Sequence, residues 1–120
     1  MKISVIIPLY NKEKYIQRTI TSALNQETLA DEILVIDDGS TDQSAHKVRE
    51  IQDPRVRLIQ QPNAGECAAR NRGLEEARNK LVALLDADDE WKPGFLTHIQ
   101  RLYRNFPDCG IYATAFNIYR

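Results

Sequence analysis

The sequence has little cysteine, few aromatic residues and no long apolar run. Its two cysteines, Cys67 and Cys109, lie far apart and form no metal-binding or redox motif. Isolated cysteines favour reduced, buried thiols in a cytoplasmic protein over a disulfide framework, although sequence alone does not exclude a disulfide. The apolar stretch near the N-terminus ends at Pro8, which makes it too short for a signal peptide or a membrane span.

An excess of charge of one sign is also missing. Sixteen basic and 17 acidic residues give a formal net charge of -1, and the basic residues are scattered. We therefore expect no general attraction to nucleic acid and no nucleic-acid partner. The length of 120 residues, with 42% hydrophobic and 28% charged residues, predicts one globular domain over residues 1–120 that is long enough to bury a core.

What is present is a regular alternation of strand-like and helix-like segments. Continuous apolar runs predict strands over residues 3–9, 33–36, 56–59, 81–85 and 111–116. Apolar residues at helical spacing predict helices over residues 13–26, 44–51, 66–80 and 95–103. Ser44 or Thr41 is the expected cap of the second helix. This order predicts an α/β fold, with helices on both faces of a mostly parallel sheet.

The most informative segment is residues 84–91 (LLDADDEW), in which an apolar run ends in three carboxylates within four residues. Acidic groups this close repel one another, so we expect a cation to offset them, and a divalent metal carried by a phosphorylated ligand is the natural candidate. The strand-like run 33–36 ends similarly, in Asp37 and Asp38. Because the carboxyl ends of parallel strands meet at one edge of a sheet, the two acidic loops predict one shared ligand crevice.

Four motifs, in this order and spacing, make the whole chain resemble the family 2 glycosyltransferases, which have the Rossmann-like GT-A fold, a three-layer α/β/α sandwich. The motifs are residues 5–11 (VIIPLYN), 35–42 (VIDDGSTD), 63–65 (NAG) followed by 69–73 (ARNRG), and 85–89 (LDADD). The family transfers a sugar from a nucleoside diphosphate donor to an acceptor, usually with Mn²⁺ or Mg²⁺. The resemblance therefore implies a metal-dependent, inverting glycosyltransferase of polysaccharide or cell-surface glycan synthesis.

The resemblance also implies roles for single residues. Those implied in nucleotide-sugar binding are Pro8, Tyr10, Asn11, Asp38, Asn63, Arg70 and Asp86. Asp86-Ala87-Asp88 matches the DXD motif of the family, so Asp88, together with Asp86, is the implied metal ligand. Carboxylate and diphosphate oxygens suit Mg²⁺ or Mn²⁺ because both are hard ligands. By analogy within the family we expect a UDP-sugar donor, a glycan or lipid-linked acceptor, and a cytoplasmic location that can include the inner face of the membrane.

Family members normally extend well beyond this length, and their further half usually holds the acceptor site and a general base. No residue here matches that base, so the catalytic residue is unassigned. We interpret the chain as the donor-binding half of a transferase or, alternatively, as a non-catalytic nucleotide-binding or assembly module. A missing second half would leave sheet surface near residues 111–116 uncovered, and such surface favours self-association.

Several of these residues also have a simpler structural interpretation. Asp86 and Asp88 suit a solvated loop, and Asp37 suits a turn. Tyr10 could be a core aromatic, Arg70 an exposed surface residue, and Trp91 either a wall of the sugar pocket or a cover of the core. A solvated helix face is the default interpretation of three basic residues, Lys12, Lys14 and Arg18.

Overall fold

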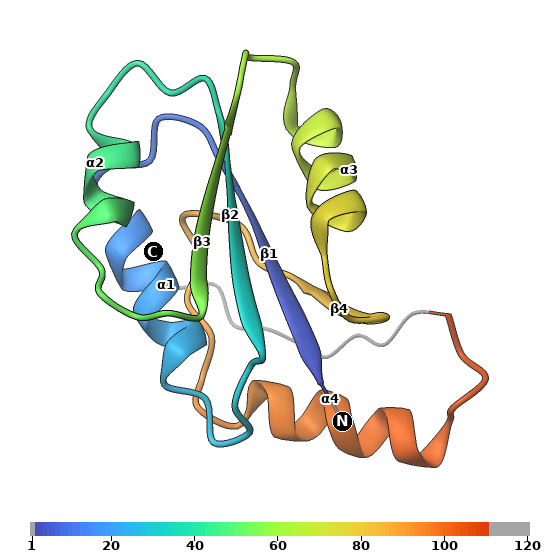
Figure 1. Cartoon of the computed structure of the whole chain (residues 1–120). Coiled ribbons are helices and arrows are strands. Elements are labelled where there is room, and N and C mark those ends of the chain that lie inside the picture. Colours follow the sequence, from blue (N-terminus) through green and yellow to red (C-terminus); the bar gives the residue numbers. More distant parts are fainter. Residues whose placement is uncertain (1, 111–120) are drawn as a thin grey trace.

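The computed structural model describes residues 2–110, which form a parallel sheet with helices packed against it (Figure 1). The elements in chain order are β1 (Ile3–Leu9), α1 (Ile16–Leu24), β2 (Glu32–Asp38), α2 (Ser44–Arg49), β3 (Val56–Gln61), α3 (Glu66–Glu76), β4 (Leu81–Leu84) and α4 (Phe95–Asn105). The strand predicted at 111–116, and with it the expected self-associating surface, lies outside the described residues.

Within the described range the sheet has four strands in the order β3-β2-β1-β4, and each neighbouring pair is parallel. The chain moves outward from β1 to β2 and β3 and then returns to the other side of β1 as β4. Strand order therefore reverses between β1 and β4. In open parallel sheets ligands bind outside the carboxyl ends of the strands at such a reversal.

The central strand β1 is buried on both faces, which explains its continuous apolar sequence. Val5 and Ile7 join a core shared with Ile20 of α1 and Val48 of α2, whereas Ile6 packs in a second cluster with Ala69 of α3. In Figure 1, α1 and α2 lie on one side of the sheet and α3 lies on the other. The predicted three-layer α/β/α arrangement is confirmed.

The start of α1 and the cap of α2 differ from the prediction. Helix α1 begins at Ile16, after a turn in which the N–H groups of Tyr15 and Ile16 both donate to the carbonyl of Lys12. The cap of α2 is Gln43, so the expected Ser44 or Thr41 cap is wrong. The Ser44 hydroxyl instead accepts a hydrogen bond from the backbone N–H of Lys12 at 2.9 Å.

The prediction that the cysteines are buried is also wrong, because Cys67 and Cys109 are both exposed as free thiols. Helix α3 turns the small residues Ala69 and Gly73, four positions apart, toward the sheet, and this places Cys67 on the outer face. Cys109 lies in a turn after α4, in which its N–H donates a hydrogen bond to the carbonyl of Phe106 at 3.2 Å. Among residues 2–110, no helix has both the length and the apolar character that crossing a membrane requires.

Candidate functional site

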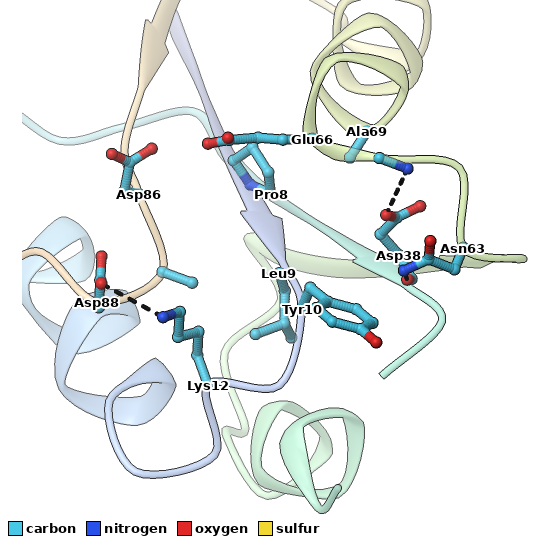
Figure 2. A pocket seen from close by; sticks show the side chains of 12 residues that line it. Pro8, Leu9, Tyr10, Lys12, Asp38, Asn63, Glu66, Ala69, Asp86 and Asp88 are labelled. Carbon is cyan, nitrogen blue, oxygen red and sulfur yellow. Dashed lines mark hydrogen bonds and ion pairs between the residues drawn. The ribbon is translucent and has the colours of Figure 1, made fainter. Parts of the chain in front are cut away.

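An open pocket of about 450 Å³ lies at the carboxyl ends of β1 and β2 and beside the segment after β4 (Figure 2). Its size is in the range of small-molecule sites. The residues lining it are Pro8, Leu9, Tyr10, Lys12, Asp38, Asn63, Gly65, Glu66, Ala69, Asp86, Ala87 and Asp88. Figure 2 shows Asp86 and Asp88 on one side and Asp38 and Asn63 on the other, with the end of β1 between them. Tertiary structure thus brings both acidic loops to one crevice.

The segment after β4 keeps the period-two alternation of an extended strand. Leu85 and Ala87 are 3% and 5% exposed and belong to the core, whereas the neighbouring Asp86 and Asp88 are exposed and line the pocket. The N–H of Leu85 continues the sheet by donating to Ile6 at 3.0 Å. Alternation and the burial of Ala87 therefore direct both carboxylates to the same side.

Two basic side chains from other parts of the chain partly offset these carboxylates. Arg70 Nη2 lies 3.4 Å from Asp86 Oδ1 and 2.7 Å from Glu66 Oε1, and Lys12 Nζ lies 3.6 Å from Asp88 Oδ2. The side chains in these pairs are substantially exposed, so each pair is screened by water. The expected cation at the acidic loop is thus supplied in part by the protein itself.

Lys12 and Glu66 are pocket residues that the sequence interpretation missed. Lys12 was expected on a solvated helix face, but α1 begins only at Ile16, and the turn after β1 leaves Lys12 at the pocket. Glu66 begins α3 immediately after Gly65, whose φ of 100° lies in the region that favours glycine. A signal for both was available, since each lies next to a residue of a quoted motif.

The negative field of the acidic loop reaches a third carboxylate. Burial raises the pKa of Asp89, the charges of Asp86 and Asp88 raise it further, and Arg18 opposes the shift. The loop therefore retains unbalanced negative charge, which suits a divalent cation. Among residues 2–110, however, no cluster of three or more His, Cys, Asp or Glu side chains could hold a metal. Two carboxylates fit Mg²⁺ or Mn²⁺ if phosphate oxygens and water complete the ligand set.

Asp38, at the end of β2, holds the loop between β3 and α3 against the pocket. Its carboxylate accepts hydrogen bonds at 2.9 Å from Gln61 Nε2 and from the backbone N–H groups of Ala64 and Gly65. Burial alone would raise the pKa of Asp38, but these hydrogen bonds outweigh it and lower the pKa. A carboxylate has about four acceptor sites, so one remains for a ligand. Asp37 fills its predicted turn role by accepting from the Ser40 N–H at 3.1 Å.

The structure settles two interpretations that the sequence left open, those of Tyr10 and Trp91. Tyr10 is 47% exposed and lines the pocket, so it is not a core aromatic. Trp91 stacks on Phe95, with ring centroids 4.5 Å apart, and packs against the core instead of lining the pocket. Arg70 is partly exposed and forms the ion pairs described above, so its role in nucleotide binding stays a prediction.

The side chain of Asn11, a predicted nucleotide contact, holds the loop after β2 instead of facing the pocket. Its φ of 49° places it in the left-handed region. Its amide oxygen accepts hydrogen bonds from the N–H groups of Thr41 and Asp42 at 2.8 and 3.3 Å. Asn11 and Arg70 are not among the lining residues of the pocket, and their contact with a nucleotide stays a prediction.

A doubly wound α/β sheet with an acidic pocket at its strand-order reversal places the chain among the α/β proteins that bind ligands at the carboxyl ends of their strands. The sequence matches the family described as Glycosyl transferase family 2 over residues 4–119. The chain therefore belongs to this family, as its motifs indicated.

Three known proteins illustrate the relationship. An uncharacterized glycosyltransferase of Nostoc sp. is 40% identical over 114 residues, which are 92% of this chain and 35% of the relative. The crystal structure of S. aureus TarS in complex with UDP-GlcNAc matches 89% of this chain and 32% of its own with a TM-score of 0.81 and 31% identity. The mannosyltransferase PcManGT of Pyrobaculum calidifontis, in complex with GDP-Man and Mn²⁺, matches 85% of this chain and 32% of its own. The TM-score is 0.79 and the identity 26%. The chain thus spans about a third of the length of each of these matched chains.

Proposed function

We propose that the pocket binds a nucleoside diphosphate sugar, foremost a UDP-sugar. The chain is then the donor-binding part of an inverting glycosyltransferase. The enzyme would act on a glycan or lipid-linked acceptor in polysaccharide or cell-surface glycan synthesis. The observation that carries the proposal is the convergence of Asp38, Asn63, Asp86 and Asp88 on one pocket in a chain of this family. TarS binds UDP-GlcNAc, which supports the choice of nucleotide.

The two sides of the pocket suit different parts of such a donor. Asp86 and Asp88 would hold Mn²⁺ or Mg²⁺, whose charge offsets the negative charge that builds up on the departing nucleoside diphosphate. On the other side, the exposed ring of Tyr10 offers a stacking surface for a base. The remaining acceptor site of Asp38 and the amide of Asn63 suit ring N–H groups or ribose hydroxyls. Pro8 would close the pocket at the end of β1.

Basic side chains border the metal side of this proposed donor site. Arg70 and Lys12, which pair with the acidic loop, would add positive charge toward the diphosphate. A guanidinium stays charged at any physiological pH and suits phosphate geometry. A cytoplasmic location, at or away from the inner face of the membrane, stays a prediction from the family resemblance.

A second candidate is a nucleotide-binding or assembly module without turnover. The observation that favours it is that every pocket carboxylate already has a protein partner. Among the described residues these carboxylates are Asp38, Glu66, Asp86 and Asp88. Each accepts a hydrogen bond or forms an ion pair, so none is an evident general base. Release of UDP from a UDP-sugar, with and without glycan acceptors, distinguishes transfer or hydrolysis from binding alone.

The test of the donor site is calorimetric titration of UDP with and without Mn²⁺. We expect Mn²⁺-dependent binding that Asp88→Ala weakens by at least about 100-fold, the upper end of what loss of an outer-shell metal partner costs. Asp108→Ala, at an exposed position away from the quoted motifs, is the matched control and should bind as the wild type does. Unchanged binding by Asp88→Ala would overturn the metal assignment. Absence of binding of UDP and GDP with either metal would overturn the donor site.

A further inference from the structure

One face of α1 carries a row of polar side chains that hydrogen-bond the backbone of the acidic loop and its continuation. The residues in this row are Arg18, Thr19 and Ser22 of α1, and Gln26 just after the end of the helix continues it. Their partners are backbone atoms of residues 87–96. The contact therefore fixes the path of the loop without using its side chains.

Thr19 lies at the centre of this row, directly behind the proposed metal ligand. Its side chain is fully buried, and its hydroxyl oxygen lies 2.8 Å from the carbonyl of Ala87 and 2.6 Å from that of Asp89. One hydroxyl proton serves both carbonyls in turn. Arg18 Nη2 donates to the carbonyl between them, that of Asp88, at 3.1 Å. The backbone on both sides of Asp88 is thus held from the helix.

The rest of the row continues this attachment. Ser22 Oγ accepts from the N–H of Trp91 at 3.1 Å. Gln26 donates to the carbonyl of Lys92 at 2.7 Å and accepts from the N–H of Leu96, at the start of α4, at 2.9 Å. The loop and its continuation are therefore attached at several points to α1 and to the segment that follows it.

We propose that Thr19 is a positioning residue of the donor site, which sets the direction of the Asp86 and Asp88 carboxylates by holding the backbone beside them. The inference rests on the proposed function, because it concerns the metal of that same site. Burial of Ala87 fixes one side of the loop, and the Thr19 hydroxyl fixes the carbonyls that decide its rotation. Groups behind a metal ligand commonly control metal affinity in this way.

The experiment compares three variants of α1 in the full chain. Thr19→Val keeps the side-chain shape but removes the hydroxyl, Thr19→Ser keeps the hydroxyl, and Thr21→Val makes the same change at an exposed position of the same helix. Two affinities are measured by calorimetry, that of UDP without metal and that of Mn²⁺ in the presence of UDP. Fluorescence of Trp91, the single tryptophan of the chain, reports loop rearrangement independently. Circular dichroism establishes that each variant is folded.

We expect Thr19→Val to weaken Mn²⁺ binding by about 10- to 100-fold while the metal-free UDP affinity stays unchanged. Thr19→Ser should restore Mn²⁺ binding, and Thr21→Val should match the wild type. Equal Mn²⁺ affinity in Thr19→Val and Thr21→Val, or no rescue by serine, would overturn the inference while leaving the proposed function intact. Failure of the wild type itself to bind UDP and Mn²⁺ would instead reject the proposed function.

If Thr19→Val does not fold, a second variant, Ser22→Ala, tests the same inference. Ser22→Ala removes the acceptor of the Trp91 N–H at a partly exposed position. If the row on α1 positions the metal loop, Ser22→Ala also weakens Mn²⁺ binding selectively, by a smaller factor than Thr19→Val. Wild-type Mn²⁺ affinity in a folded Ser22→Ala would then overturn the inference.

Discussion

At the scale of single residues, Lys12 forms an ion pair with Asp88, the proposed metal ligand. Its Nζ lies 3.6 Å from Asp88 Oδ2, and both side chains are less than half exposed. A metal that binds Asp88 must compete with this charge. The ammonium and a divalent ion would therefore act as alternatives at this carboxylate when no nucleotide is present.

We accordingly predict that Lys12→Gln raises the affinity for Mn²⁺ in the absence of nucleotide. An exposed ion pair contributes about 0.2–1 kcal/mol, so the expected increase is at most about fivefold. Lys14→Gln removes the same charge at an exposed position two residues further on and should leave the affinity unchanged. Titration of Mn²⁺ into each protein measures the effect. A decrease in affinity for Lys12→Gln would show that the lysine does not compete with the metal.

At the scale of elements, the close approach of α3 to β1 brings the start of α3 to the pocket. A Cβ added to Gly73 would overlap the side chain of Ile6, which is fully buried in the sheet. Because Ala69 lies one turn before Gly73 on the same face, the glycine allows Ala69 and Glu66 to reach the pocket edge. Small residues on α3 thus have a functional consequence.

We predict that Gly73→Ala destabilises the protein despite the better helix propensity of alanine. The propensity gain is about 1 kcal/mol, whereas overpacking a core costs about 1–3 kcal/mol, so the expected net loss is about 1 kcal/mol. Urea unfolding followed by circular dichroism measures it. Gly110→Ala, where the added Cβ meets open space, is the control. A gain in stability for Gly73→Ala would mean that α3 can move away from β1 without cost.

At the scale of the whole molecule, Glu32 connects elements at the end of the sheet opposite the pocket. Its nearly inaccessible carboxylate accepts from Ser4 Oγ of β1 at 2.7 Å, from Arg57 Nη1 of β3 at 2.9 Å, and from the Arg78 N–H before β4 at 2.6 Å. Burial would raise the pKa of Glu32, but these hydrogen bonds and the charge of Arg57 outweigh burial and lower it. The ionised carboxylate therefore stabilises the folded state.

We predict that Glu32→Gln lowers the free energy of unfolding at neutral pH by about 1.5–3 kcal/mol, the range for hydrogen bonds to a charged group. A folded-state pKa below the unfolded value gives stability that is present above the unfolded pKa, about 4.3 for Glu. That stability is lost as the pH falls through the folded pKa. The difference between wild type and Glu32→Gln should therefore shrink in acid.

Denaturant unfolding at a series of pH values tests this dependence. Glu75→Gln, at an exposed position of α3, is the control and should follow the wild type at every pH. A constant difference between wild type and Glu32→Gln down to strongly acidic pH would contradict the role of the ionised carboxylate.

The sequence by itself determined the order and type of the described elements and the residues that end the strands. Apolar runs identified the buried strands, and the acidic residues that follow two of them predicted one shared crevice. Element boundaries were less predictable, because side-chain hydrogen bonds such as that of Ser44 to Lys12 compete with helix capping. Family membership also followed from the motifs alone, and the match over residues 4–119 confirmed it.

Tertiary structure decided which distant residues share the site. The pairings of Lys12 with Asp88 and of Arg70 with Asp86 span many residues, and no local pattern encodes them. The same holds for the hydroxyl of Thr19 behind the acidic loop, 68 residues away from Ala87. A local pattern fixes the face on which a side chain lies, whereas only the packing of helices on the sheet fixes what that face meets.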